Sequence, residues 1–244
     1  MKIDKNVTTV GEIAALNFGY TDVMNNHGID FCCNGQDTLQ RASDKVGADP
    51  DAVIRDLEAY QEKGGQGAIP FTTFPKDLLI DYILKIHHRG IRIEGPKIRA
   101  LFEKVIKVHG DKHPELHEVR ALFAQTLMAL ESHLTKEEQM LFPHLYQQIA
   151  NLYNNRPWEA FHCGTVEGPI SVMEHEHGEE GVRAHKMIDL TDHFTPPADA
   201  CESFKLLYRM LHDFIHGLFE HIHLENNILF PWAIAAEKEK MGIE

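Results

Sequence analysis

The apolar positions of this 244-residue chain recur mainly every three or four residues, which is the period of an α-helix. Four long stretches follow this pattern, at about residues 76–95, 115–150, 168–190 and 197–238. Proline suits the first turn of a helix, so Pro114, Pro169 and Pro196 support three of the starts, the last with Thr195 as N-cap. No stretch alternates apolar and polar residues between hairpin turns. The pattern predicts an all-α, up-down four-helix bundle.

A stretch rich in glycine and proline precedes the bundle. It has three glycines within four positions and then two prolines, a composition that cannot continue a helix. Thr9 and Glu12 form a capping box ahead of short apolar repeats, so the part before it is also predicted to be helical. We therefore predict a small helical Cys-Cys domain, a flexible linker and the bundle, at residues 1–62, 63–75 and 76–244.

The charge balance narrows the choice of partners. Asp and Glu total 37 against 24 Lys and Arg, a formal net charge of −13, and such a surface repels phosphate groups. This argues against nucleic acid or an anionic membrane as partner. No apolar run approaches the roughly 18 residues of a spanning helix, and the first residues lack a secretory signal. We expect a cytoplasmic protein.

Two copies of the pattern His-x-x-x-Glu carry the clearest chemical signal. They are His133 with Glu137 and His221 with Glu225, and in each copy Phe-Pro follows five residues after the Glu. A spacing of four residues puts imidazole and carboxylate on one face of a helix. One copy alone is weak evidence, but two copies 88 residues apart indicate a repeated helix pair.

The repeat predicts one further ligand on each preceding helix. The candidates are His88 and His177, which lie 45 and 44 residues before the histidines of the two motifs. His177 continues a stripe of apolar and small residues, whereas His175 lies on a polar face. On the first helix the periodicity favours His88 over His87 only slightly.

The same argument from helix faces prefers Glu137 to Glu138 and His221 to His223. Carboxylates that bridge facing bundle helices are how di-iron proteins of this architecture hold two ions. A three-ligand zinc hydrolase site fits the duplicated Glu less well. We predict two iron ions per chain, bound by His88, His133, Glu137, His177, His221 and Glu225.

Several longer motifs resemble those of one family. They lie at residues 30–35 (Asp-Phe-Cys-Cys-Asn-Gly), 132–139, 168–174 and 224–231. Through these motifs the chain is similar to the repair-of-iron-centres (RIC) proteins, which are di-iron proteins with a hemerythrin-like bundle and an N-terminal Cys-Cys domain. The resemblance covers nearly the whole length and implies the six ligands above, with His88 in place of His87.

The resemblance also implies a function. It predicts repair of iron–sulfur clusters damaged by oxidative or nitrosative stress, through iron donated from a labile, carboxylate-bridged di-iron site, oxo- or hydroxo-bridged. Cys32 and Cys33 would be the thiols that deliver the iron. Partners would be damaged iron–sulfur proteins and gases such as nitric oxide or oxygen, and a homodimer is compatible with the family. Oxygen-carrying hemerythrins, which are similar, place a second His one turn after the third-helix ligand, where this chain has Gly181.

Two other function classes stay open. One is a sensor or scavenger that binds nitric oxide or oxygen and retains its iron. The other is an enzyme such as a di-iron nitric oxide reductase, so the sequence leaves open whether the protein is an enzyme.

We expect removal of the metal to lower the melting temperature markedly. Four histidines and two carboxylates buried together are costly without a cation, at several kcal/mol for an unpaired buried carboxylate. Thermal unfolding before and after chelation measures the effect. Equal melting temperatures would count against a buried metal site.

Overall fold

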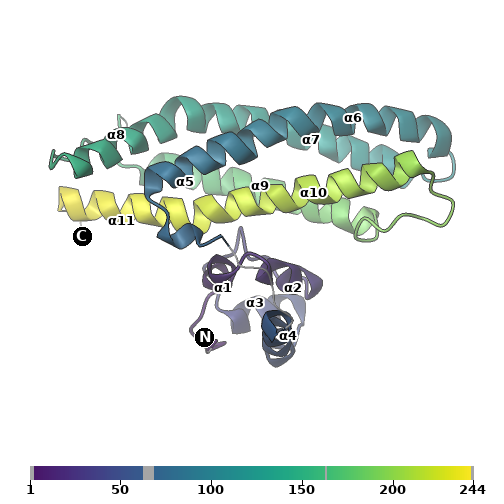
Figure 1. The fold of residues 1–244 in the computed structure, drawn as a ribbon, viewed down its shortest axis with the longest axis horizontal. Coiled ribbons are helices and arrows are strands. Elements are labelled where there is room, and N and C mark those ends of the chain that lie inside the picture. Colours follow the sequence, from purple (N-terminus) through teal and green to yellow (C-terminus); the bar gives the residue numbers. More distant parts are fainter. Residues whose placement is uncertain (1–2, 63–68, 163, 243–244) are drawn as a thin grey trace. The chain divides into compact units, whose positions relative to one another are not determined.

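The computed structural model describes residues 3–62, 69–162 and 164–242 (Figure 1). Within those ranges the chain forms helices and two isolated bridges but no β-strand, which confirms the all-α class. No helix in these ranges is long and apolar enough to cross a membrane. Residues 63–68 of the predicted linker and Cys163 lie outside the described residues. The predicted domain boundaries stay a prediction.

The chain forms two compact units. The first holds the residues up to Leu79 together with those from Glu220 onwards, and the second is Ile80–Phe219. The boundaries fall inside two helices, α5 (Lys76–Tyr82) and α10 (Glu202–Leu224). Both units therefore contain part of α10.

Four long helices build the second unit, and Figure 1 shows them running alongside one another. They are α6 (Arg89–His109), α7 (Glu115–Lys136), α9 (Glu167–Leu190) and α10 up to Phe219. Phe123 of α7 contacts Phe102 of α6 and Phe214 of α10, with ring centroids 5.8 and 5.1 Å apart. His185 of α9 packs on Phe219 at 5.3 Å. These contacts confirm the predicted four-helix bundle.

Two predicted helix boundaries are wrong. The first helix does not end near residue 95 but continues through Pro96 to His109. An interior proline costs about 3 kcal/mol, but Ile98 and Phe102 beyond it are fully buried, each worth about 1.5–3 kcal/mol. The last helix begins at Glu202 rather than behind Thr195, because Pro197 disfavours helical backbone at the preceding Pro196 and residues 195–201 form a loop.

The two His-x-x-x-Glu segments share one local structure. In each, a π-helical segment begins at the Glu and a 12-residue helix with Pro in its first turn follows. The Phe N–H before each Pro donates to the carbonyl of the Glu five residues earlier. Proline has no N–H and crowds the carbonyl four residues back, and a wider turn relieves both problems. The segments are η3 (Glu137–Leu141) with α8 (Phe142–Tyr153), and η4 (Glu225–Leu229) with α11 (Phe230–Met241).

Short helices make up the N-terminal part of the first unit. Thr9 accepts a hydrogen bond from the N–H of Glu12, whose carboxylate accepts one from the N–H of Thr9, so the predicted capping box is confirmed. The helices are α1 (Val10–Leu16), α2 (Tyr20–Asn26), α3 (Leu39–Val46), α4 (Pro50–Glu62) and the 3-10 turn η1 (Phe71–Thr73).

Segment η4 belongs to the same unit and contacts the loop before α3. Asn227 Nδ2 donates to the carbonyl of Phe31 at 3.2 Å, and Asn226 Nδ2 donates to the carbonyl of Cys32 at 3.2 Å. The backbone of Gly35 lies close to Asn227: a Cβ on Gly35 would be 2.0 Å from Asn227 Oδ1. Glycine at position 35 therefore allows the loop and η4 to meet.

We expect Gly35→Ala to lower the free energy of unfolding by about 1–3 kcal/mol, because the new methyl group displaces Asn227 from its hydrogen bonds. Denaturant unfolding measures the change. The control is Gly217→Ala in α10, where a Cβ meets nothing within 4 Å. That helical substitution should be neutral or stabilising by up to about 1 kcal/mol. Equal effects of the two substitutions would contradict this account.

Candidate metal centre

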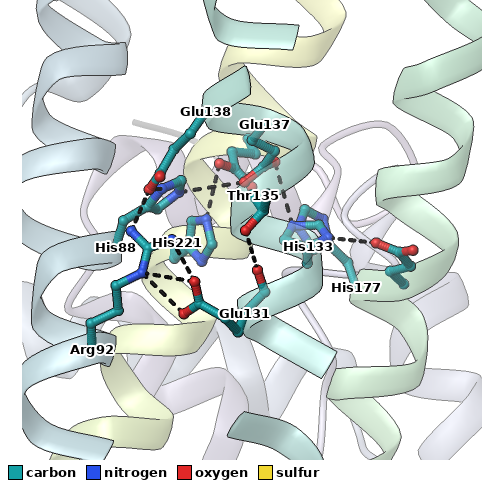
Figure 2. Close-up of polar contacts among 11 residues, drawn as sticks. His88, Arg92, Glu131, His133, Thr135, Glu137, Glu138, His177 and His221 are labelled. Carbon is teal, nitrogen blue, oxygen red and sulfur yellow. Dashed lines mark hydrogen bonds and ion pairs between the residues drawn. The ribbon is translucent and has the colours of Figure 1, made fainter. Parts of the chain in front are cut away.

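Three predicted histidines and one predicted carboxylate lie in the second unit and are buried. His88 ends the π-helical segment η2 (Ile83–His88), His133 lies in the last turn of α7, and His177 lies in α9. Their exposed fractions are 1%, 3% and 1%, and that of Glu137 is 0%. The structure brings these four side chains together (Figure 2).

The two oxygens of Glu137 face different histidines. Oε2 lies 3.4 Å from His88 Nε2, and Oε1 lies 3.4 Å from His133 Nε2. The carboxylate therefore stands between one histidine on each side, which is the arrangement that a bridging carboxylate needs. Glu137 opens segment η3, so the wider turn sets the position of this side chain.

His133 and His177 converge on one point. Their Nε2 atoms are 2.9 Å apart, and a ligand atom from each lies within 4.8 Å of Glu137. Two nitrogens that bind one ion at right angles, each about 2.1 Å from it, are about 3 Å apart. Imidazole nitrogen and carboxylate oxygen are donors that iron and other transition metals accept. Spacing and donor type both fit a bound cation.

Two further carboxylates hold the outer nitrogens of these rings. Glu138 Oε1 lies 2.9 Å from His88 Nδ1 (Figure 2). Glu176 Oε2 lies 2.8 Å from His133 Nδ1. An ionised carboxylate can only accept a hydrogen bond, so each Nδ1 carries the proton. The Nε2 lone pair of each ring then points towards Glu137. Histidines that bind metal are commonly oriented in this way.

Cations keep both outer carboxylates ionised. Burial alone would raise the pKa of Glu138, but hydrogen bonds from Arg92 and His88 hold it below its ordinary value. Burial alone would also raise the pKa of Glu176, but hydrogen bonds from Lys136 and His133 hold this pKa below its ordinary value. Arg92 also pairs with Glu131 at 3.0 Å (Figure 2).

The second His-x-x-x-Glu pair lies in the first unit. His221 Nε2 and Glu225 Oε1 are 3.0 Å apart, and both side chains have an exposed fraction of 0%. Glu225 opens η4 as Glu137 opens η3. Helix α10 runs unbroken from the bundle to Leu224 and carries His221 in its last turn.

The three histidines that are alternatives to the predicted ligands differ in their exposure and contacts. His175 is exposed, in agreement with its polar face. His87 is buried, but its ring packs against Tyr82 at 5.4 Å. His223 is also buried, although the argument from helix faces prefers His221 to it as a ligand. Burial lowers its pKa to about 4, so its Nδ1 accepts a hydrogen bond from Asn227 Nδ2 at 3.0 Å.

The two adjacent cysteines differ in exposure. Cys32 is 1% exposed and Cys33 is half-buried. Burial, then the neighbouring Cys33 and Asp30, raises the pKa of the Cys32 thiol well above its ordinary value. The two Sγ atoms are 3.7 Å apart, and Asp30 Oδ1 accepts hydrogen bonds from the backbone N–H groups of both cysteines. Asp30, Cys32 and Cys33 could together hold a metal ion.

Comparison with known proteins identifies the family. The family described as "Hemerythrin HHE cation binding domain" matches residues 79–233, and a "Domain of Unknown function (DUF542)" matches residues 6–61. The iron-sulfur cluster repair protein YtfE of Musicola paradisiaca is 36% identical over 94% of this chain and 97% of its own length. The chain belongs to the iron–sulfur cluster repair protein family. YtfE of Yersinia pseudotuberculosis serotype O:1b is also 36% identical, over 89% of this chain and 92% of the relative.

Membership of the repair-protein family confirms the resemblance stated from the motifs. The bundle is a hemerythrin-like cation-binding domain, and the buried His and Glu side chains described above provide suitable donors for a metal such as iron. The identity of each ligand and the number of ions per chain stay predictions.

Sequence reasoning missed the partners of the outer ring nitrogens. Helix periodicity indicates Glu138 only as a rival of Glu137, and it does not indicate Glu176. Each carboxylate directly follows or precedes a predicted ligand, and that adjacency was the available signal. Which ring each one reaches depends on how α7 packs against α6 and α9.

We expect Glu138→Gln and Glu176→Gln each to weaken metal retention about 10- to 100-fold, because a neutral amide oxygen accepts the hydrogen bond from the ring N–H more weakly than a carboxylate does. Competition with a chelator measures the affinity. The control is Glu179→Gln, an exposed residue on α9 whose carboxylate lies 3.7 Å from exposed His175. A loss no larger than that of the control would show that the outer carboxylates do not orient the ligands.

Proposed function

We propose that this protein repairs iron–sulfur clusters damaged by oxidative or nitrosative stress by donating iron from a carboxylate-bridged di-iron site. The names of the relatives, iron-sulfur cluster repair proteins, support the repair role. The observation that carries the site is Glu137, whose two oxygens face different histidines. The proposed ligands are His88, His133, Glu137, His177, His221 and Glu225.

The repeat supports two ions per chain. His221 and Glu225 occupy in the second helix pair the places that His133 and Glu137 occupy in the first, with the same π-helical segment after each. Each ion would then receive two imidazoles and share two carboxylates. We propose iron because a duplicated set of His and bridging Glu in a bundle suits a dinuclear redox metal.

The small number of protein ligands on each proposed ion favours release of the iron. Gly181, one turn after His177 in α9, has no side chain to offer as a further ligand. Two imidazoles per ion leave coordination positions to small molecules, so the site should hold its iron less tightly than a closed one. Nitric oxide and oxygen are therefore proposed as further ligands.

Cys32 and Cys33 are the proposed delivery residues. Thiolate sulfur, rather than thiol, binds metal, and the raised pKa of Cys32 keeps its thiol protonated at neutral pH. Half-buried Cys33 would therefore contact the iron first. Asp30, whose carboxylate belongs to the same cluster, would add an oxygen donor. A cytoplasmic location, damaged iron–sulfur proteins as partners and a homodimer complete the proposal.

The test is iron transfer from anaerobically purified protein to a dehydratase whose cluster has lost iron. We expect about two iron ions per chain at the start and recovery of the acceptor's activity as that iron leaves. The variant Cys32→Ala, Cys33→Ala should retain its iron but transfer it slowly, while Cys201→Ala, which removes an exposed cysteine, should transfer it normally.

Other outcomes would exclude the proposal. Stoichiometric binding of nitric oxide with all iron retained beside the acceptor would favour a sensor or scavenger. Consumption of many nitric oxide molecules per site would favour a reductase. Normal transfer by the double cysteine variant would remove the delivery role alone.

A further inference from the structure

A second cluster of metal-binding side chains lies in the second unit, where α6 ends. His109 is the last residue of α6, His113 lies in the turn before α7, and Asp199 lies in the loop before α10. One ligand atom from each of the three lies within 4.8 Å of the others. His113 Nε2 is 3.0 Å from Asp199 Oδ1. Three segments that are distant in sequence thus bring two imidazoles and a carboxylate together.

His109 is buried, with an exposed fraction of 8%. Its ring packs against Phe204 at 5.2 Å, and the His113 ring contacts the same Phe204 at 5.3 Å. Among the residues that the structure describes, none forms a hydrogen bond with His109 Nε2. A buried ring nitrogen without a hydrogen bond destabilises the folded protein unless water or an ion binds it.

His113 is already oriented as a metal ligand. Its Nδ1 lies 3.1 Å from Glu115 Oε1, so that carboxylate can hold the Nδ1 proton and turn Nε2 towards Asp199. Glu138 holds His88 in the same way at the candidate metal centre. The hydrogen bond from His113 lowers the pKa of Asp199, which keeps its carboxylate ionised.

We propose that His109, His113 and Asp199 form a mononuclear site for a divalent transition-metal ion such as Zn²⁺. Two imidazoles and one carboxylate are a common ligand set for zinc and for ferrous iron. The ion takes the place of the proton between His113 Nε2 and Asp199, and this proton leaves to solvent. Asp199 is half exposed, so water fills the remaining coordination positions.

A network of hydrogen bonds without a metal ion explains only part of this cluster. It accounts for the contacts of His113 with Glu115 and Asp199, and Lys112 lies 3.8 Å from Asp199 as a competing cation. It leaves the buried Nε2 of His109 unexplained. A bound ion would use a donor atom from each of the three residues, because one ligand atom of each lies within 4.8 Å of the others.

The proposed site is independent of the iron centre. His109 follows His88 by the length of α6, whose 21 residues span about 30 Å at 1.5 Å per residue. Loss of one site therefore need not disturb the other, and the proposal does not rest on the repair function.

The test uses the full-length protein with its iron, dialysed against Zn²⁺ buffered by a chelator. Zinc and iron per chain are measured by mass spectrometry for wild type, His113→Gln, Asp199→Asn and Glu115→Gln. The control is His117→Gln, which changes an exposed histidine in the first turn of α7. Circular dichroism without zinc checks that each variant folds, and Co²⁺ absorption reports the ligand field independently.

We expect wild type and His117→Gln to take up one zinc ion per chain more than His113→Gln does, with iron unchanged, so that zinc on the two adjacent cysteines is subtracted. His113→Gln and Asp199→Asn should bind it at least about tenfold more weakly and lose the Co²⁺ bands, and Glu115→Gln should weaken it about tenfold. The proposal is overturned if His113→Gln and Asp199→Asn bind zinc as wild type does. It is equally overturned if wild type takes up no zinc, or takes it up only as iron is lost.

Discussion

The arrangement of the bundle depends on one constraint, which is that ionisable side chains are buried in its interior. Glu137 is fully buried, and an uncompensated carboxylate there would cost several kcal/mol. Neutral imidazoles alone cannot balance its charge, whereas a bound cation can. The surrounding groups follow from this need: Glu138 and Glu176 hold the outer ring nitrogens, and Arg92 and Lys136 balance those two carboxylates.

The backbone adapts to the same requirement. Both His-x-x-x-Glu segments leave regular helix at the Glu, because the following proline cannot donate and crowds the preceding turn. The wider turn aims the carboxylate differently from a regular helix and then lets the helix continue. Wide turns of this kind occur often at functional sites. The proline in each motif thus helps to position the proposed ligand, the Glu at which the wider turn begins.

Residues around the second pair have two different tasks within the first unit. His221 and Glu225 contact each other, while Asn226 and Asn227 hold the carbonyls of the Cys-Cys loop. A substitution in η4 could therefore affect the proposed ligands and the cysteine loop together. This segment thus joins the proposed ligand Glu225 to the loop that carries the two cysteines.

Helical periodicity, the capping box at Thr9 and the duplicated motif could all be predicted from the sequence, because each depends on residues within a few turns of one another. Burial of the six candidate ligands followed from the same periodicity. Continuation of α6 through Pro96, burial of His223 and the pairing of Glu176 with His133 could not be predicted in this way. The His109 cluster belongs with them. Each depends on how helices distant in sequence rotate and pack, and only the tertiary structure decides that.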